Sequence, residues 1–418
     1  MKNDFLEVFK ENFTIKILII FILIFPIVLL IGSAVINTCI VLMNIFFLIH
    51  IIIKKKYEIF KNDVFYSLIA LWVFLILNTL MNSNFSENYS RSFGFIRFIL
   101  LVFMFAYIFT FKNHKYKKLI FKFWSIIFAV ISLDLIFEYI FTFNSLGFKT
   151  PYDGRLVGFM GDQLKIGHWY ACFSLIVIAK YFDQKKMFYF LLLLSIFVSF
   201  IIGERANFIR LFLALSFLLI IARLLNFKKI ILLAFSIVML FYLAVITEKS
   251  ERNYLKNRYF DQINQVLKAT SIKEINDKNT YTPMYFNAYD LFEKNKILGV
   301  GPGFYLEKSH ENFRLNKKIN GYSILPNTHP HQFHFEILAT LGLPGYLFII
   351  TFLLYFLIKS FRFYKNKKNP INLTSLLFIF VFLIPLLPTG SFYTTYGASI
   401  FWLNFSLMTL GNFKNLDH

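Results

Sequence analysis

A histidine cluster with the spacing needed for acid–base chemistry stands directly before an apolar stretch, in Thr328-His329-Pro330-His331-Gln332-Phe333-His334. Proline suits the first turn of a helix, so Pro330 predicts that His331 lies within the first turn of the helix that follows. A histidine with an ordinary pKa of roughly 6.5 is suited to act as a general base. A helix N-terminus favours its neutral form. His331 is therefore the candidate catalytic base.

A zinc site is the competing interpretation of this cluster, because His331 and His334 are three residues apart and share a helical face. The sequence shows no cysteine nearby and no obvious third ligand, so we expect neither a metal nor another cofactor. Histidines with purely amphipathic roles at a membrane surface are the remaining alternative.

Arg205 is the second candidate, in the very short connection Gly203-Glu204-Arg205 between two apolar stretches. A guanidinium binds phosphate or pyrophosphate in bidentate fashion, so Arg205 is a candidate anion clamp. Snorkelling to the surface, or an ion pair with Glu204, is the alternative. Arg210 follows about a turn and a half later and can reach the same surface.

Two further groups of charged residues have competing interpretations. In the loop Lys149–Lys165, Arg155 and Lys165 are suited to hold an anionic lipid head group, or are ordinary solvated charges. Asp134 and Glu138 are four residues apart on one face of an apolar helix, as in a proton or ion path. They would indicate a transporter or flippase, yet the sequence shows no matching halves of the kind that many transporters have.

The elements that must position these residues are membrane helices. Hydrophobic residues make up 57% of the 418 residues and charged residues 16%, against about 25% charged in soluble domains. Apolar runs long enough to cross a bilayer recur along the chain. We predict an all-α polytopic protein with about twelve spans near 17–33, 35–53, 64–80, 95–111, 123–142, 166–182, 187–202, 206–222, 230–247, 332–358, 371–387 and 394–410.

The net charge of +21 is explained by loop charge, so no nucleic-acid partner is needed. Lysine and arginine concentrate in alternate short loops, such as Lys54–Lys56 and Lys365–Lys368, which indicates that these loops and both termini are cytoplasmic. The chain then divides into N-terminal helices (1–247), a large external loop (248–330) and C-terminal helices (331–418). Cys39 and Cys172 lie in apolar spans, so a disulfide framework is not expected.

The loop 248–330 is expected to be largely helical. Tyr259, Phe260, Ile263, Val266 and Leu267 recur at helical spacing, and Met284, Ala288 and Leu291 form a second amphipathic stretch. The following run Gly299-Val300-Gly301-Pro302-Gly303 predicts a tight turn. It has neither a preceding strand nor a following Lys-Ser or Lys-Thr, which disfavours a phosphate loop.

The segment from His329 to Gly345 resembles the signature of the O-antigen ligase and polymerase superfamily, in which a His-Asn pair opens a helix and a Gly-Leu-Ile-Gly-like step follows eleven residues later. His331 stands eleven residues before Gly342 and matches the essential histidine of the family. Gly203-Glu204-Arg205 is similar to the family's Gly-Ser-Arg at a helix start, and Ile297–Gly303 to its segment after an outer helix.

The chain departs from the family in two places. Gln332 replaces the asparagine that follows the histidine. Tyr281 and Tyr285 stand where many members have an arginine. If that arginine grips a lipid pyrophosphate, Arg155 or Arg258 must replace it here.

The resemblance implies a GT-C-like glycosyltransferase of the bacterial inner membrane that needs neither a metal nor a nucleotide sugar. The donor would be a glycan on undecaprenyl pyrophosphate. His331 would activate an acceptor hydroxyl and Arg205 would stabilise the leaving group. A ligase would use lipid A–core as the acceptor, and a polymerase a second lipid-linked repeat unit. The expected substrate-binding residues are Arg155, Arg210, Tyr281, Arg258, His329, Gln332 and His334.

Overall fold

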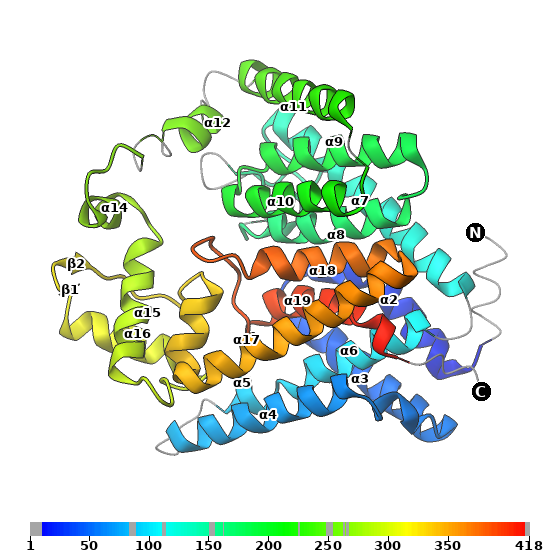
Figure 1. The fold of residues 1–418 in the computed structure, drawn as a ribbon, viewed down its shortest axis with the longest axis horizontal. Coiled ribbons are helices and arrows are strands. Elements are labelled where there is room, and N and C mark those ends of the chain that lie inside the picture. The colour runs from blue at the N-terminus through cyan, green and yellow to red at the C-terminus, as the bar shows by residue number, and fades with distance from the viewer. Residues whose placement is uncertain are drawn as a thin grey trace.

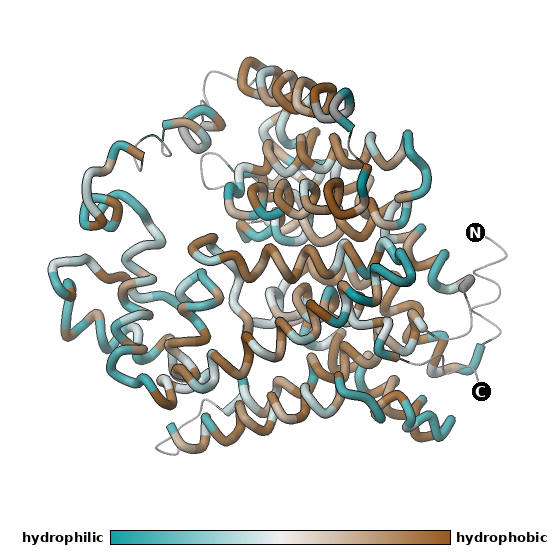
Figure 2. The backbone as a smooth tube through the Cα atoms, in the orientation of Figure 1, coloured by the Kyte–Doolittle hydropathy of each residue, from teal (hydrophilic) through white to brown (hydrophobic). Residues whose placement is uncertain are grey.

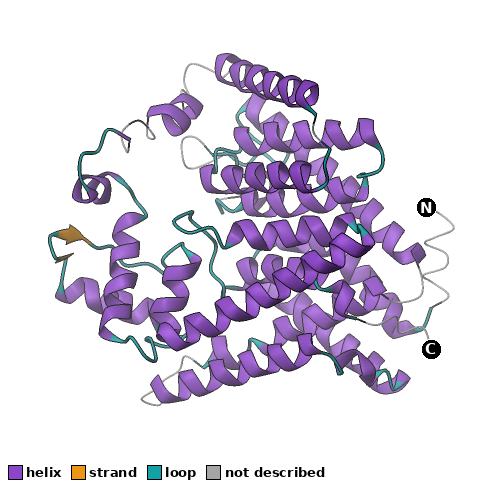
Figure 3. Ribbon diagram, in the orientation of Figure 1, coloured by secondary structure: helices purple, strands orange, loops and turns teal. Residues whose placement is uncertain are grey.

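The computed structural model describes residues 11–82, 89–110, 114–149, 155–161, 163–224, 226–247, 254–261, 264 and 267–413. These residues form a bundle of helices with one small pair of strands (Figures 1 and 3), which confirms the predicted all-α polytopic class. Each of the twelve expected apolar ranges contains a helix, namely α2 (Phe13–Ile31), α3 (Ser33–Lys54), α4 (Asp63–Asn82), α6 (Ile96–Thr110), α7 (His114–Phe141), α8 (Ile166–Lys180), α9 (Lys185–Ile201), α10 (Arg205–Ile221), α11 (Phe227–Thr247), α17 (Phe333–Lys367), α18 (Pro370–Phe382) and α19 (Thr395–Met408). Short helical turns join them, among them η1 (Tyr57–Phe60), α5 (Ser90–Phe93), η2 (Gly158–Met160) and η4 (Leu410–Asn412).

Length and apolar composition identify the membrane-spanning helices. Within the described ranges, six helical segments are long and apolar enough to cross a membrane, in α2, α3, α4, Ser90–Thr110, α7 and α17. Helices α8 and α18 and the Ile231–Leu243 part of α11 are shorter apolar helices. On α11, Leu232, Phe235 and Val238 are more than 60% exposed, as expected for side chains that face lipid. The molecule is thus a multi-pass membrane protein, and the count of twelve spans stays a prediction.

Helix α19 forms the centre of the bundle. Every side chain from Tyr396 to Met408 is buried, and α19 packs against α3, α6, α8 and α18. A helix that is apolar around its whole circumference must be enclosed by others. Figure 2 shows brown, apolar backbone throughout the bundle and teal, hydrophilic backbone in the segment beside it.

That hydrophilic segment is the loop 248–330, called the long loop below. It contains α12 (Tyr254–Lys256), a π-helical turn η3 (Asn257–Asp261), α14 (Ile272–Lys278), α15 (Thr282–Lys294), α16 (Tyr305–Leu315), and the antiparallel strands β1 (Lys318–Ile319) and β2 (Tyr322–Ser323). The helical expectation is confirmed for α15, whose Met284, Ala288 and Leu291 are buried. Ile263 and Val266 of the other predicted amphipathic stretch lie outside the described residues.

The long loop is anchored to the first part of α17. Helix α15 packs on α17, and Ala288 and Leu291 share a small core with Ala339. The predicted glycine turn is present, with φ of +67° at Gly299 and +88° at Gly301. The predicted continuous helix over 332–358 was wrong in one respect, because the backbone of α17 leaves helical geometry at Gly342.

Candidate functional site

A cavity of about 850 Å³ lies where the bundle meets the long loop. Most of its lining comes from the connections before α8 and α10, from the long loop and the residue His331 just after it, and from the turn between α18 and α19. Six of the nine predicted site residues line it, namely Arg155, Arg205, Arg210, Tyr281, His329 and His331. The structure therefore brings together residues that are up to 176 positions apart, from 155 to 331.

His331, which lines this cavity, is held in an unusual backbone conformation. Its φ is +55°, a left-handed conformation that non-glycine residues adopt rarely and that often marks a functional position. Thr389 N donates to the His331 carbonyl at 2.7 Å. The rings of His329 and Tyr281 flank the imidazole, with centroids at 4.1 Å and 5.7 Å.

The predicted position of His331 within the first helical turn was wrong. Helix α17 begins at Phe333, and Gln332 is the N-cap residue, whose side-chain oxygen accepts from Phe335 N at 2.9 Å. The side-chain oxygen of Gln332 thus accepts from a backbone N–H of the first turn that would otherwise lack a partner. The chain can therefore turn sharply at His331, just outside the helix. Burial, and then the positive charge of Arg155, lower the pKa of His331 below its ordinary 6.5. The imidazole is thus neutral near pH 7, as a general base must be.

His329 is shifted in the same direction. Burial lowers its pKa to about 3, with further contributions from His331, Arg91 and Lys165. Its Nδ1 lies 3.1 Å from Thr328 Oγ1. His329 is therefore a neutral neighbour of His331 rather than a second cation.

The lining residues from the connections before α8 and α10 and from the first turns of α10 carry the positive charge, and they are called the cationic wall below. Among the described lining residues, Arg155, Lys165, Arg205 and Arg210 are cationic and Glu204 is the one carboxylate. Glu204 Oε1 accepts from Gly167 N at 3.2 Å and Oε2 from Asn207 Nδ2 at 2.5 Å. Four cations against one carboxylate leave an excess of three positive charges, which favours an anionic ligand with at least two negative charges.

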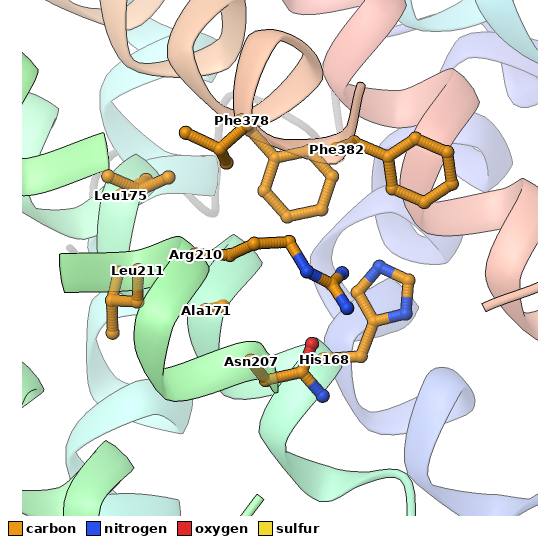
Figure 4. A pocket seen from close by; sticks show the side chains of 9 residues that line it. His168, Ala171, Leu175, Asn207, Arg210, Leu211, Phe378 and Phe382 are labelled. Carbon is orange, nitrogen blue, oxygen red and sulfur yellow. The ribbon is translucent and has the colours of Figure 1, made fainter. Parts of the chain in front are cut away.

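Arg210 belongs to this cationic wall, and Figure 4 shows its surroundings. The guanidinium of Arg210 points toward the ring of His168, with Asn207 beside them and Phe378 and Phe382 above. Arg210 also donates to the carbonyl of Pro388, in the turn between α18 and α19. Arg210 is 6% exposed, so it does not snorkel to the surface.

Several buried polar atoms of the cavity have no hydrogen-bond partner among the described residues. They are Arg155 Nε, Arg210 Nε, His168 Nε2, His329 Nε2 and Thr389 Oγ1. Buried donors without partners are costly and rare in folded proteins. Their concentration around one cavity indicates a site that is built for a polar ligand.

Two predicted site residues that the structure describes, Gln332 and His334, do not contribute side chains to the cavity. Gln332 is buried as the cap of α17. His334 faces the bundle, where its ring nitrogens lie 3.0 Å from Tyr346 Oη and 2.8 Å from the carbonyl oxygen of Leu383. His331 and His334 therefore do not form the pair that a zinc site would need. The side chain of Arg258 lies outside the described part of the chain.

The two carboxylates that suggested a transporter have structural partners instead. Glu138 accepts from the backbone amides of Val157 and Gly158 at 2.9 and 2.8 Å, and Asp134 accepts from Ser145 N at 2.8 Å. Both side chains thus fold the connection between α7 and α8. These contacts leave the transporter interpretation without its main support.

Sequence reasoning missed the turn between α18 and α19, which holds His331 through Thr389 and Arg210 through Pro388. It also passed over Asn279 and Asn327, two uncharged lining residues of the long loop. The sequence feature that indicates this turn is the short run Pro388-Thr389-Gly390-Ser391 of small and polar residues between two apolar stretches.

Comparison with known families gives a match to the family described as O-antigen ligase over residues 190–350. The matched region runs from α9 into α17 and contains Arg205, Arg210, Tyr281, His329 and His331. No curated protein matches the chain. Over this region the chain is similar to the O-antigen ligase family, which supports the resemblance to the O-antigen ligase and polymerase superfamily of membrane glycosyltransferases.

Proposed function

We propose that the protein transfers a glycan from undecaprenyl pyrophosphate to an acceptor sugar hydroxyl, without a metal or a nucleotide sugar. The proposal rests on the observation that a neutral histidine and three arginines, Arg155, Arg205 and Arg210, line one cavity. The base and the anion clamp that such a transfer requires thereby line the same cavity. We further propose that this cavity faces the periplasm, in an inner-membrane protein with both termini in the cytoplasm.

In the proposed reaction, His331 takes the proton of the acceptor hydroxyl while that oxygen forms a bond to the anomeric carbon of the donor. The bond between the anomeric carbon and the pyrophosphate oxygen breaks, and its electron pair leaves with undecaprenyl pyrophosphate. The developing negative charge is stabilised by Arg205, with Arg155 and Arg210 beside it. Preorganised donors of this kind typically contribute about 3–4 kcal/mol each to the transition state.

Arg155 is the proposed substitute for the arginine that many family members have near Tyr281. It lines the cavity, and its charge reaches both His331 and Glu204. Its Nε has no hydrogen-bond partner among the described residues, so it is available to a phosphate oxygen. Arg258 has no described side chain from which to argue the same role.

Between the two acceptors we favour lipid A–core, the acceptor of a ligase, over a second lipid-linked repeat unit, the acceptor of a polymerase; the family match is compatible with both. The banding pattern of lipopolysaccharide from a deletion strain tests this. Loss of all O-chain, with lipid-linked polymer accumulating, marks a ligase. Core carrying a single repeat unit marks a polymerase.

Complementation of the same strain tests the residues. His331→Ala and Arg205→Ala should each abolish glycan transfer while the protein still inserts into the membrane at normal level. His310→Ala and Arg314→Ala, at exposed positions of α16, are the matched controls and should restore transfer. Normal surface glycan with His331→Ala would overturn the proposal.

A further inference from the structure

The two walls of the cavity differ in charge according to the part of the chain that supplies them. All formally charged lining residues described belong to the connections before α8 and α10 or to the first turns of α10. The long loop and the residues just after it supply only uncharged side chains, namely Leu267, Asn279, Tyr281, Asn327, Thr328 and the two neutral histidines. His331 belongs to this uncharged wall and faces a volume that Arg155 also lines. A ligand in the cavity therefore meets cations supplied by one part of the chain and hydrogen-bonding neutral groups supplied by another.

The two asparagines of the uncharged wall are arranged alike. Asn279 Oδ1 accepts from Tyr281 N at 2.8 Å, and Asn327 Oδ1 accepts from Thr328 N at 2.7 Å. Each carbonyl oxygen thus fixes its own turn, as asparagines commonly do in turns. Each amide nitrogen, with two donor hydrogens, is left with little to bind. Asn327 Nδ2 reaches only the Met284 sulfur at 3.3 Å, a weak acceptor, and Asn279 Nδ2 has no partner among the described residues.

An aromatic ring completes this wall. Tyr281 packs edge-on against the His331 ring, at 5.7 Å between centroids and 66° between planes, and half of its surface or more is shielded from solvent. Aromatic side chains provide rigid apolar contact area beside a polar edge. Amide donors, a hydroxyl and an aromatic ring next to the catalytic base together match the hydroxyls and the apolar face of a pyranose. They offer nothing to neutralise an anion.

We propose that this wall, made of Asn279, Tyr281, Asn327 and Thr328, is the acceptor subsite, and that it binds an uncharged sugar ring whose hydroxyl points at His331. The assignment rests on the proposed function and adds to it the chemical class of the acceptor's reacting end. The pyrophosphate of the donor then occupies the cationic wall. One cavity can hold both substrates because the two walls do not compete for the same groups.

The test compares donor binding and acceptor use in the full-length protein in proteoliposomes. Donor binding is measured with undecaprenyl pyrophosphate as the probe. Transfer is measured with the lipid-linked glycan extracted from the deletion strain, while the acceptor glycolipid fraction of that strain is titrated. Asn279→Asp and Asn327→Asp keep the Oδ1 acceptors that fold the two turns and replace each amide donor by a negatively charged oxygen. They therefore change ligand binding without removing the turn contacts.

We expect each variant to raise the KM for the acceptor by about tenfold or more, since one lost hydrogen bond with an added charge costs this much. The affinity for undecaprenyl pyrophosphate should stay within about twofold of wild type. Asn316→Ala, at an exposed position beyond α16, should change neither quantity.

An acceptor KM within about twofold of wild type in both variants would overturn the subsite. A fall in undecaprenyl pyrophosphate affinity as large as the rise in KM would also overturn it, by moving these asparagines to the donor site. Failure of the wild-type protein to bind undecaprenyl pyrophosphate would instead overturn the proposed donor. The experiment thus distinguishes a wrong acceptor subsite from a wrong donor.

Discussion

Gly299 of the long loop and Gly342 of α17 pack backbone against backbone. A Cβ added to Gly299 would lie 2.3 Å from the Thr340 carbonyl carbon, and one added to Gly342 would lie 2.3 Å from the Ile297 carbonyl oxygen. Both residues have a φ of +67°. No side chain larger than hydrogen fits at either position without moving backbone.

The contact replaces the backbone hydrogen bonds that α17 lacks where its helical geometry is interrupted at Gly342. Pro344 has no N–H to offer the Thr340 carbonyl, and Leu343 N turns away to the Lys296 carbonyl at 2.7 Å. The carbonyls of Ala339 and Thr340 instead accept from Val300 N and Gly301 N at 2.8 and 2.9 Å. The long loop therefore supplies the donors that the helix lacks, and this fixes the loop relative to the residues that lead to His331.

Substitution of Gly342 should consequently destabilise the protein strongly. Gly342 has a φ of +67° and a ψ of −171°, a backbone conformation essentially confined to glycine. Gly342→Ala adds a steric clash with backbone to the roughly 1–3 kcal/mol that this conformation costs, so we expect a total above about 3 kcal/mol. Gly321→Ala is the matched control, because Gly321 has a φ of +82° but a Cβ added there would meet nothing within 4 Å. Thermal unfolding of the purified variants in detergent measures both. Equal losses for the two would show that the close approach is unimportant.

The candidate site was predictable to the extent that its residues are charged or titratable. Arg155, Arg205, Arg210 and His331 stand out in an apolar chain because burying them needs a reason, and loop charge placed them on one side of the bundle. Asn279 and Asn327 carry no such signal, since asparagines are ordinary turn residues. His331 lies two residues before the start of α17 rather than inside its first turn, because Gln332, rather than Pro330, determines where α17 begins. The break at Gly342 depends on donors from Val300 and Gly301, a long-range contact that local sequence patterns do not contain.

The pH dependence of transfer should report the lowered pKa of His331. A base must be neutral to accept a proton, so activity is lost as pH falls through its pKa. Since burial and Arg155 hold that pKa below 6.5, the acidic limb of the rate profile should lie below pH 6.5. Arg155→Gln removes the charge that lowers the pKa, and its limb should move upward while the rate itself falls. Initial rates between about pH 4.5 and 8 measure the limb. A wild-type limb above pH 6.5 would be incompatible with the assignment.

The cationic wall predicts a graded response at Arg205. Arg205→Ala should reduce kcat by about 10²–10³, as for loss of one preorganised donor to a developing anion. Arg205→Lys should recover part of this loss, because a lysine keeps the charge but not the bidentate geometry. Single-turnover transfer with the extracted lipid-linked glycan gives these rates. Equal activity of the lysine and alanine variants would indicate that the guanidinium does not act through its charge.

Glu336 gives a prediction for a positioning residue outside the cavity. Its buried carboxylate accepts from Ser391 Oγ and from Phe392 N, the latter at 2.8 Å. It thereby holds the turn that carries Pro388 and Thr389, the partners of Arg210 and His331. Loss of this acceptor leaves two buried donors unpaired, at about 1–3 kcal/mol each.

Glu336→Ala should therefore lower kcat by at least about tenfold even in protein that remains folded, because a misplaced base and clamp act through geometry. Glu336→Gln should retain most activity, since a glutamine oxygen can accept from Phe392 N while its amide donates to Ser391 Oγ. The two variants are compared by kcat at equal amounts of folded protein. Their affinity for undecaprenyl pyrophosphate tests separately whether Arg210 is still correctly placed. If the alanine variant is as active as the glutamine variant, the turn is held by other contacts. If the glutamine variant fails as badly as alanine, the negative charge of Glu336 matters beyond its role as an acceptor.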